Sequence, residues 1–243
     1  VPLLECVRRA ESLLLEQAAP RSYLPIDGLP AYDRAVRELV FGAACPALKE
    51  GRIVTVQTLG GTGGLKIGAD FLQHLAPKAV AWISDPTWEN HRGVFENAGF
   101  TVHAYSYYDA KTHGLNFEAM VAALRAMPSG SVVVLHACCH NPTGVDLSPA
   151  QWTTVTEAVI SRGLIPFLDI AYQGFGEGLD PDAAAVRQFA QSGMPLLVSS
   201  SFSKSLSLYG ERIGSLSVVA ETSDQAERVL SQLKRLVRTN YSN

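Results

Sequence analysis

The chain has 243 residues, of which 47% are hydrophobic and 18% charged, and its formal net charge is −3. This is the composition of a folded protein with enough apolar residues for one large core or two small ones. The chain has no long basic run, so we do not expect it to bind nucleic acid. No apolar run reaches the roughly 18 residues that a membrane helix needs. The opening residues 1–17 lack the regions of a signal peptide, so we expect a cytoplasmic protein.

Taken in chain order, the hydrophobic pattern predicts helices and strands in alternation. It predicts an opening helix at about 3–18, a turn-rich segment at 20–30, a helix at about 31–42 and a strand at 52–58. A glycine-rich turn then enters a helix over 61–75, followed by a strand at 79–84, a helix at 91–99, a strand at 102–108 and a helix at 117–127. The rest reads as a strand at 131–137, a helix at 149–163, a strand at 164–170, a helix at 182–193, strands at 194–201 and 212–220, and a closing helix at 223–239.

Most of the predicted strands are short, apolar throughout and separated by helices. This pattern indicates an α/β fold with three layers, in which a mostly parallel sheet is covered by helices on both faces. No repeat or linker divides the chain, so we expect one unit over 1–243, with 1–30 leading into it. In such sheets ligands bind at the carboxyl ends of the strands. Unusual groups follow five of the predicted strands, namely Gly60–Gly64, Trp88, Asn141, Asp169 with Tyr172, and Lys204.

The four cysteines are Cys6, Cys45, Cys138 and Cys139. Adjacent residues on a strand face opposite sides, so a disulfide framework is not expected, and free buried thiols fit a reducing compartment. HACCH at 136–140 could be read as a metal centre. Its side chains would alternate between faces and no CxxC pair supports it, so we expect no metal.

The glycine-rich segment LGGTGGLK at 59–66 precedes a predicted helix, whose free backbone N–H groups can hold a phosphate. It matches neither familiar nucleotide signature, because Leu65 and Ile67 flank Lys66 and no glycine stands at the sixth position from Gly61. Taken alone, such a glycine-rich helix entry is more often only a tight turn.

Three single residues each allow two interpretations. Lys204 follows a strand among small residues, where a partly desolvated amine could form a Schiff base, but it could also be a solvated loop lysine. Asp169 ends a buried strand and needs a cationic partner such as a protonated pyridine nitrogen, or it caps a helix or joins a salt bridge. Trp88 could stack on a planar cofactor or simply pack.

In combination these segments resemble a known family. SFSKSLSLYGERIG at 201–214, HNPTG at 140–144, DIAYQGF at 169–175 and QTLGGTGG at 57–64 are similar, in order, to four motifs of the class I (fold type I) pyridoxal-phosphate aminotransferases. The similarity covers nearly the whole chain and is greatest to the aspartate and aromatic amino acid aminotransferases. The stretches at 164–180 and 205–219 favour the aromatic, tyrosine-type branch.

The resemblance implies a role for each matching residue. Lys204 would form the Schiff base with pyridoxal 5′-phosphate and carry the proton during catalysis, with Asp169 and Tyr172 as its catalytic partners. Asp169 would keep the pyridine nitrogen protonated. The other implied contacts are Trp88 on the ring, Asn141 and Tyr172 at the phenolic oxygen, Gly61, Thr62, Ser201 and Arg212 at the phosphate, and His91 and His136 orienting Asp169.

Two further matches imply a homodimer with shared active sites. Tyr23 resembles a tyrosine that contacts the partner subunit's cofactor phosphate. Arg238 resembles an arginine that meets the distal carboxylate of a substrate in the partner's site, and Trp88 and Asn141 are the other implied substrate contacts. Without the resemblance, a surface turn tyrosine and a helix-end arginine would be the simpler interpretations. One departure is Gly60, which stands where many relatives have a serine.

The resemblance therefore implies a large cofactor-binding domain over 1–243, with the small domain absent from this sequence. The implied reaction moves an amino group from an aromatic or dicarboxylic L-amino acid to 2-oxoglutarate, and we expect the isolated 243 residues to transaminate poorly. Aspartate aminotransferase proper, a lyase or decarboxylase of the same fold, and a non-enzymatic regulatory domain are the alternatives.

Overall fold

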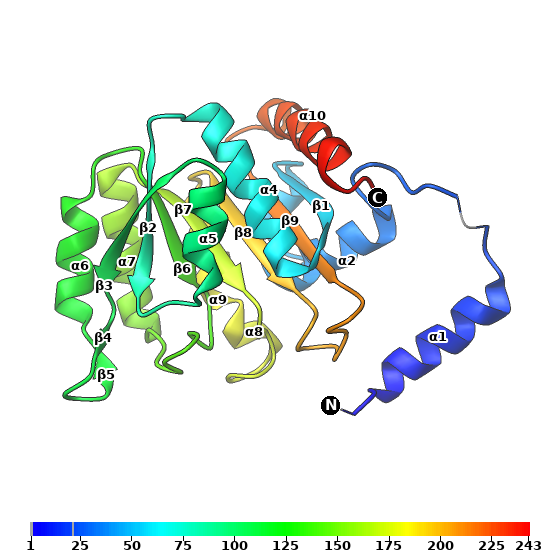
Figure 1. The fold of residues 1–243 in the computed structure, drawn as a ribbon, viewed down its shortest axis with the longest axis horizontal. Coiled ribbons are helices and arrows are strands. Elements are labelled where there is room, and N and C mark those ends of the chain that lie inside the picture. Colours follow the sequence, from blue (N-terminus) through cyan, green and yellow to red (C-terminus); the bar gives the residue numbers. More distant parts are fainter. Residues whose placement is uncertain (1, 21) are drawn as a thin grey trace.

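The computed structural model describes residues 2–20 and 22–243. Val1 and Arg21, which belong to the expected lead-in segment 1–30, lie outside the described residues. The chain forms a seven-stranded sheet in the order β1-β9-β8-β7-β6-β2-β3 (Figure 1). Its strands are β1 (Ile53–Leu59), β2 (Val80–Asp85), β3 (Thr101–Ser106), β6 (Val132–His136), β7 (Ile165–Ile170), β8 (Leu196–Ser201) and β9 (Ile213–Val219).

The direction of the strands confirms a mostly parallel sheet. β3, β2, β6, β7 and β8 pair in parallel, whereas β9 is antiparallel to both of its neighbours, β8 and β1. The sequence predicted β9 as a strand but not its direction. No helix lies between β8 and β9, which is the kind of connection that joins antiparallel neighbours. The antiparallel return brings the start of β9 beside the carboxyl ends of β1 and β8.

Helices cover both faces of the sheet, which confirms the three layers. Buried residues of α4 (Gly60–Leu75), α5 (Asn90–Asn97) and α10 (Ser223–Asn240) share one hydrophobic cluster with the sheet. Those of α2 (Pro30–Phe41), α6 (Phe117–Ala126), α7 (Pro149–Arg162) and α9 (Ala184–Gln191) form a second cluster. Short elements that the pattern did not predict are α3 (Pro46–Lys49), α8 (Leu179–Asp182) and the hairpin of β4 (Tyr108–Asp109) and β5 (Gly114–Leu115).

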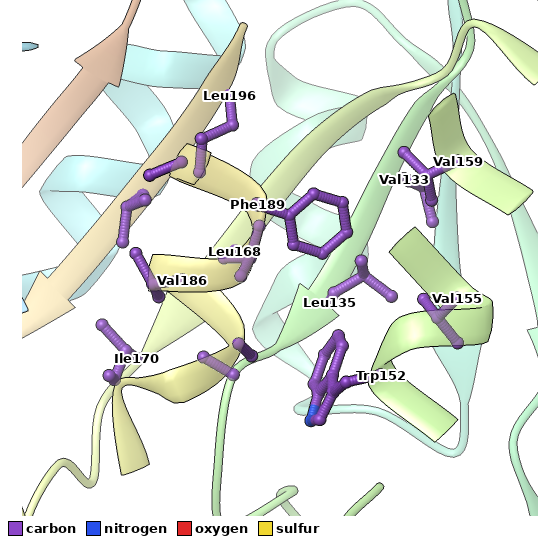
Figure 2. Packing of buried hydrophobic residues seen from close by; sticks show 14 of the residues in the cluster. Val133, Leu135, Trp152, Val155, Val159, Leu168, Ile170, Val186, Phe189 and Leu196 are labelled. Atoms are coloured by element: carbon purple, nitrogen blue, oxygen red, sulfur yellow. The ribbon is translucent and has the colours of Figure 1, made fainter. Parts of the chain in front are cut away.

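The second cluster shows why the strands read as uniformly apolar. Phe189 of α9 and Trp152 of α7 lie over Leu135 of β6 and Leu168 of β7 (Figure 2). The opposite face of the same strands packs on the first cluster, where Phe167 is completely buried. Since both faces exclude water, neither position of the strand alternation can be polar along most of its length.

The first helix, α1 (Glu5–Gln17), extends away from this layered body (Figure 1). Val7 is its buried residue, whereas Leu13, Leu14 and Leu15 are 55%, 65% and 82% exposed. A run of apolar side chains in water is unfavourable unless another surface covers it. Among the described residues, no helix combines the length and the apolar character needed to cross a membrane.

A buried carboxyl group lies on α2. Asp33 of α2 is 5% exposed, and its Oδ1 atom has no hydrogen-bond partner among the described residues. Arg37 on the same helix, Asp27 of the preceding loop and Lys234 of α10 are the charged groups that act on it. Burial raises the pKa of Asp33 to about 7, and Asp27 adds to the rise against the opposing effect of Arg37 and Lys234.

We predict that Asp33→Asn stabilises the fold at alkaline pH. The raised pKa means that the folded state favours the protonated acid, so this group's stabilisation is complete below its unfolded pKa and is lost as pH rises towards 7. The neutral amide avoids the loss and should raise the free energy of unfolding by about 2 kcal/mol at pH 8, with little gain at pH 4. Urea unfolding at both pH values measures this, with exposed Glu227→Gln as the control. An equal effect at pH 4 and pH 8 would contradict the explanation.

Candidate active site

A crevice of about 560 Å³, including its open mouth, lies at the carboxyl ends of β6, β7 and β8 and the start of α4. It brings together most of the residues that the sequence singled out. These are Gly61, Thr62, Trp88, His136, Asn141, Asp169, Tyr172, Ser201, Lys204 and Arg212. Leu65, Cys138, Ala171 and Ser203 also line it and were not predicted. These four residues lie within or close to the quoted motifs, and this was the only signal in the sequence that could have pointed to them.

The first turn of α4 forms one end of the crevice. The sequence predicted a glycine turn before this helix, but α4 begins at Gly60 itself, directly after β1. The hydroxyl of Thr58 donates to the Gly60 carbonyl at 2.9 Å, and that of Ser199 donates to the Gly61 carbonyl at 2.8 Å. The N–H groups of Gly61 and Thr62 have no acceptor among the described residues, as is usual at a helix start. The result is a fixed set of donors suited to an anion.

Two glycines allow Arg212 to join this end. Gly60 has a φ of 67°, and its N–H donates to the Arg212 carbonyl at 2.9 Å. A Cβ atom on Gly60 would lie 2.6 Å from Arg212 Nη2, and one on Gly214 would lie 2.3 Å from the Gly60 carbonyl carbon. Arg212 itself has a φ of 57°, and its Nη1 donates to the Tyr209 carbonyl at 3.0 Å. A side chain at position 60 would therefore require the Arg212 guanidinium to move from the position it has here.

A buried carboxylate forms the other end. Asp169 is the last residue but one of β7 and is 6% exposed, and its Oδ2 atom is 3.1 Å from His91 Nε2. The Nδ1 atom of His91, which is completely buried, is 2.8 Å from Thr87 Oγ1. Since a carboxylate only accepts, His91 donates to Asp169 from Nε2. Thr87 was not predicted, although it adjoins Trp88. The Trp88 ring meets His91 edge to face, at 5.4 Å between ring centroids.

Two further imidazoles lie beside His91 and stay neutral. Burial, followed by the neighbouring His91 and His140, holds the pKa of His136 well below its usual value. Burial and His91 lower the pKa of His140 to about 4. His136 lies 4.9 Å from His91 between ring centroids, but no hydrogen bond joins it to Asp169 among the described residues, and its Nε2 atom lacks a partner. Of the two histidines expected to orient Asp169, only His91 makes that contact.

Lys204 lines the same crevice. Its Nζ atom is 5.6 Å from the centre of the Tyr172 ring and 5.9 Å from that of Tyr209, and it forms no ion pair within the described parts of the chain. Burial, Tyr209 and then Asp169 raise the pKa of Tyr172, so this phenol keeps its proton and can donate a hydrogen bond at neutral pH. The lysine is therefore a half-buried amine with room for a ligand beside it.

Two expected site residues lie elsewhere in this single chain. Tyr23 is 88% exposed, and Arg238 of α10 donates to Ser242 Oγ at 2.6 Å. Neither lines the crevice. Because the resemblance assigned both to a partner subunit's site, a single chain leaves that expectation untested.

The expectation that Cys138 and Cys139 face opposite sides is wrong. Both lie beyond the end of β6, and Cys139 has a φ of 49°, so the alternation of a strand no longer applies. Their sulfur atoms lie within 4.8 Å of each other and of a carboxylate oxygen of Asp182. All four cysteines are free, but Cys6 is exposed and not buried as expected. Within HACCH, both ring nitrogens of His140 are engaged by Ser84 and Thr143, and the expectation that this segment holds no metal stays untested.

Comparison with known proteins agrees with this geometry. The family model described as "Aminotransferase class I and II" matches residues 2–243. The chain belongs to this aminotransferase family. It is 58% identical over 243 residues to a Pseudomonas aeruginosa protein named aspartate aminotransferase, covering 100% of this chain and 61% of that protein. It is 53% identical over 244 residues to the aromatic-amino-acid aminotransferase of Escherichia coli, covering 100% and 62%.

Solved structures of the aminotransferase family have the same fold. A crystal structure of a Burkholderia pseudomallei aromatic-amino-acid aminotransferase, covalently bound to pyridoxal phosphate, superposes with a TM-score of 0.99 at 62% identity. It is matched over 100% of this chain and 61% of its own. The chain thus spans about three fifths of the length of these relatives. The likeness confirms the fold type expected from the motifs.

We predict that Gly60→Ala weakens anion binding at the start of α4. The added methyl group would displace Arg212 and would also strain a backbone held at positive φ. The affinity for inorganic phosphate should fall by about tenfold or more, as measured by calorimetric titration. Gly63→Ala is the matched control, because Gly63 lies in the same helical turn and its Cβ would meet Leu59 Cβ at 3.3 Å. Equal affinities of Gly60→Ala and the parent protein would exclude an anion site built on Arg212.

Proposed function

We propose that the crevice binds pyridoxal 5′-phosphate and that the protein is an aminotransferase of the aromatic and aspartate type. The observation that carries this proposal is a half-buried lysine that has no ionic partner in the described part of the chain and shares one crevice with an anion-binding helix start and a buried carboxylate. Few ligands need all three groups at once. A phosphate, an aldehyde and a basic ring nitrogen on one small molecule would use each of them.

The residues of the crevice fit the cofactor at its phosphate end. Gly61 and Thr62 offer free backbone donors, Ser201 offers a hydroxyl, and Arg212 offers a planar guanidinium suited to a dianion. The guanidinium of Arg212 occupies the space that a Cβ atom on Gly60 would need. This end is therefore a phosphate cradle made of backbone and one fixed cation.

Asp169 is suited to hold a proton at the pyridine nitrogen. Its Oδ2 atom accepts from His91, so the carboxyl group is fixed in orientation while Oδ1 remains for a cationic donor. Trp88 lines the same end and offers an aromatic face to a ring. Asn141 and the protonated Tyr172 offer donors to a phenolic oxygen. When bound, the cofactor supplies a conjugated ring that accepts the electron pair released at the substrate's Cα.

Lys204 is the proposed catalytic residue. Its amine is the nucleophile for the cofactor's aldehyde and, once an incoming amine has displaced it, the base that takes and returns the proton at the substrate's Cα. The Nζ atom of Lys204 lies 5.6 Å from the centre of the Tyr172 ring, and both residues line the crevice where the nucleophile and the base are needed.

The proposed reaction of the whole protein transfers an amino group from an aromatic L-amino acid to 2-oxoglutarate. Relatives of similar identity are named for aspartate and for aromatic amino acids, so aspartate aminotransferase is the second candidate. Arg238 is suited to a substrate's distal carboxylate in a partner's site. Steady-state rates with tyrosine, phenylalanine and aspartate separate the two branches.

We further propose that residues 1–243 are the large cofactor-binding domain of a cytoplasmic homodimer, with 1–30 leading into it. The exposed leucines of α1 and the exposed Tyr23 support a partner subunit at this end of the chain. Each site would then be completed by Tyr23 and Arg238 of the other subunit.

We predict that Lys204→Ala abolishes the covalent attachment of pyridoxal phosphate. The protein mixed with the cofactor should show a visible absorbance band, and borohydride reduction should fix the cofactor's mass on the peptide that contains Lys204. Lys66→Ala is the matched control, because Lys66 lies near the same helix start but pairs with Asp70. Labelling of another lysine would refute the assignment.

Product analysis with the cofactor bound separates the rival reactions. Amino transfer requires a 2-oxo acid acceptor, whereas a lyase or a decarboxylase releases product without one. A regulatory domain would bind the cofactor but would convert neither the amino acid nor the 2-oxo acid.

We predict that Leu14→Glu weakens self-association. The charge would enter the apolar surface of α1, and the dimer dissociation constant should rise by about 100-fold, measured by analytical ultracentrifugation. Ile160→Glu, at a 45% exposed position on α7, is the control and should leave association unchanged. A parent protein that stays monomeric at high concentration would contradict the proposed dimer.

A further inference from the structure

The adjacent cysteines Cys138 and Cys139 lie in a turn whose backbone N–H groups are bound by one carboxylate. The N–H of Cys139 donates to Asp146 Oδ2 at 2.6 Å, and that of His140 donates to Asp146 Oδ1 at 2.8 Å. One carboxylate therefore fixes two successive peptide groups and the positive φ of Cys139. Both sulfur atoms are brought to the same side, within 4.8 Å of each other.

Tyr172 and Asp182, from a later part of the chain, also lie close to the two thiols. Cys139 Sγ lies 4.0 Å from the carbonyl oxygen of Tyr172. Asp182, whose carboxylate oxygen lies within the same 4.8 Å, accepts from the N–H groups of Gly174, Gly176 and Glu177. The thiol pair is thus arranged before any ligand arrives, and a ligand that takes both sulfurs loses little further freedom.

The charge around the pair decides which ligand it suits. Burial, then the neighbouring thiol and the carboxylates of Asp182 and Asp146, raise the pKa of Cys138, and burial and the same carboxylates raise that of Cys139. Both thiols therefore keep their protons at neutral pH. A divalent metal ion needs thiolates and a free third ligand, whereas the Asp182 oxygens already accept three backbone donors. A neutral dithiol suits a reagent that condenses with two S–H groups and releases water.

We propose that Cys138 and Cys139 form a binding site for trivalent arsenic compounds. With an arsenoxide, two As–S bonds form, the two bonds of the As=O group break, and the oxygen leaves as water with both thiol protons. Arsenic stays trivalent and sulfur is not oxidised, so no further reactant is needed. Cys138 also lines the crevice, which gives a small aromatic arsenoxide a route to the pair from solvent.

Phenylarsine oxide is the probe that tests this site in the folded chain. Intact mass spectrometry should find one arsenical per chain, with loss of the two thiols. The adduct should survive an excess of a monothiol and be removed by ethane-1,2-dithiol, because only a dithiol can match attachment at two sulfurs.

Single substitutions locate the adduct. Cys138→Ser and Cys139→Ser should each raise the dissociation constant by about 100-fold or more, since each leaves a single attachment. Cys6→Ser and Cys45→Ser are the matched controls and should bind as the parent does. Urea unfolding of each variant checks that the fold is kept. If a Ser variant unfolds, peptide mapping of the arsenical on the parent protein decides instead. Mapping to Cys6 or Cys45, or an adduct that a monothiol removes, would overturn the proposal.

Discussion

The close contact between Gly60 and the start of β9 is the constraint on which the site depends. The Gly60 N–H donates to the Arg212 carbonyl, and a Cβ on Gly214 would overlap the Gly60 backbone at 2.3 Å. Because neither residue has a side chain, the corner between β1 and α4 can lie against the antiparallel strand β9. That contact brings the guanidinium of Arg212 and the first turn of α4 to the same place. Without it, the donors at the helix start and the cation would be separate features of two different elements.

The rest of the crevice follows from the parallel strands. β6, β7 and β8 run in the same direction, so Asp169, the residues around Asn141 and the loop with Lys204 all emerge at one edge of the sheet. The His91–Thr87 pair then fixes the Asp169 carboxylate, while His136 and His140 remain neutral. The crevice thus contains an acidic group, Asp169, and a basic group, Arg212. Among the described residues these two side chains form no ion pair with each other.

Much of this arrangement could be predicted from the sequence, because strands buried on both faces and strand ends with unusual residues follow simple rules. Most predicted helices and strands agree with the structure to within a few residues, and ten of the expected site residues line the crevice. The direction of β9 was not predicted, although the absence of a helix between β8 and β9 is a signal that favours an antiparallel pair. The convergence of Cys138 and Cys139 was missed because it depends on the positive φ of Cys139 and on Asp146 seven residues later. The partner of His91 beyond Asp169, Thr87, likewise needed the fold.

A crystal structure of the protein with pyridoxal phosphate is the most direct test of the proposed orientation of the ligand. Our account predicts the phosphate against Arg212 and the N–H groups of Gly61 and Thr62, the ring nitrogen at Asp169 Oδ1, and continuous electron density from Lys204 Nζ. A phosphate bound at the Asp169 end, or density that leaves Lys204 unmodified and distant from the cofactor, would contradict it.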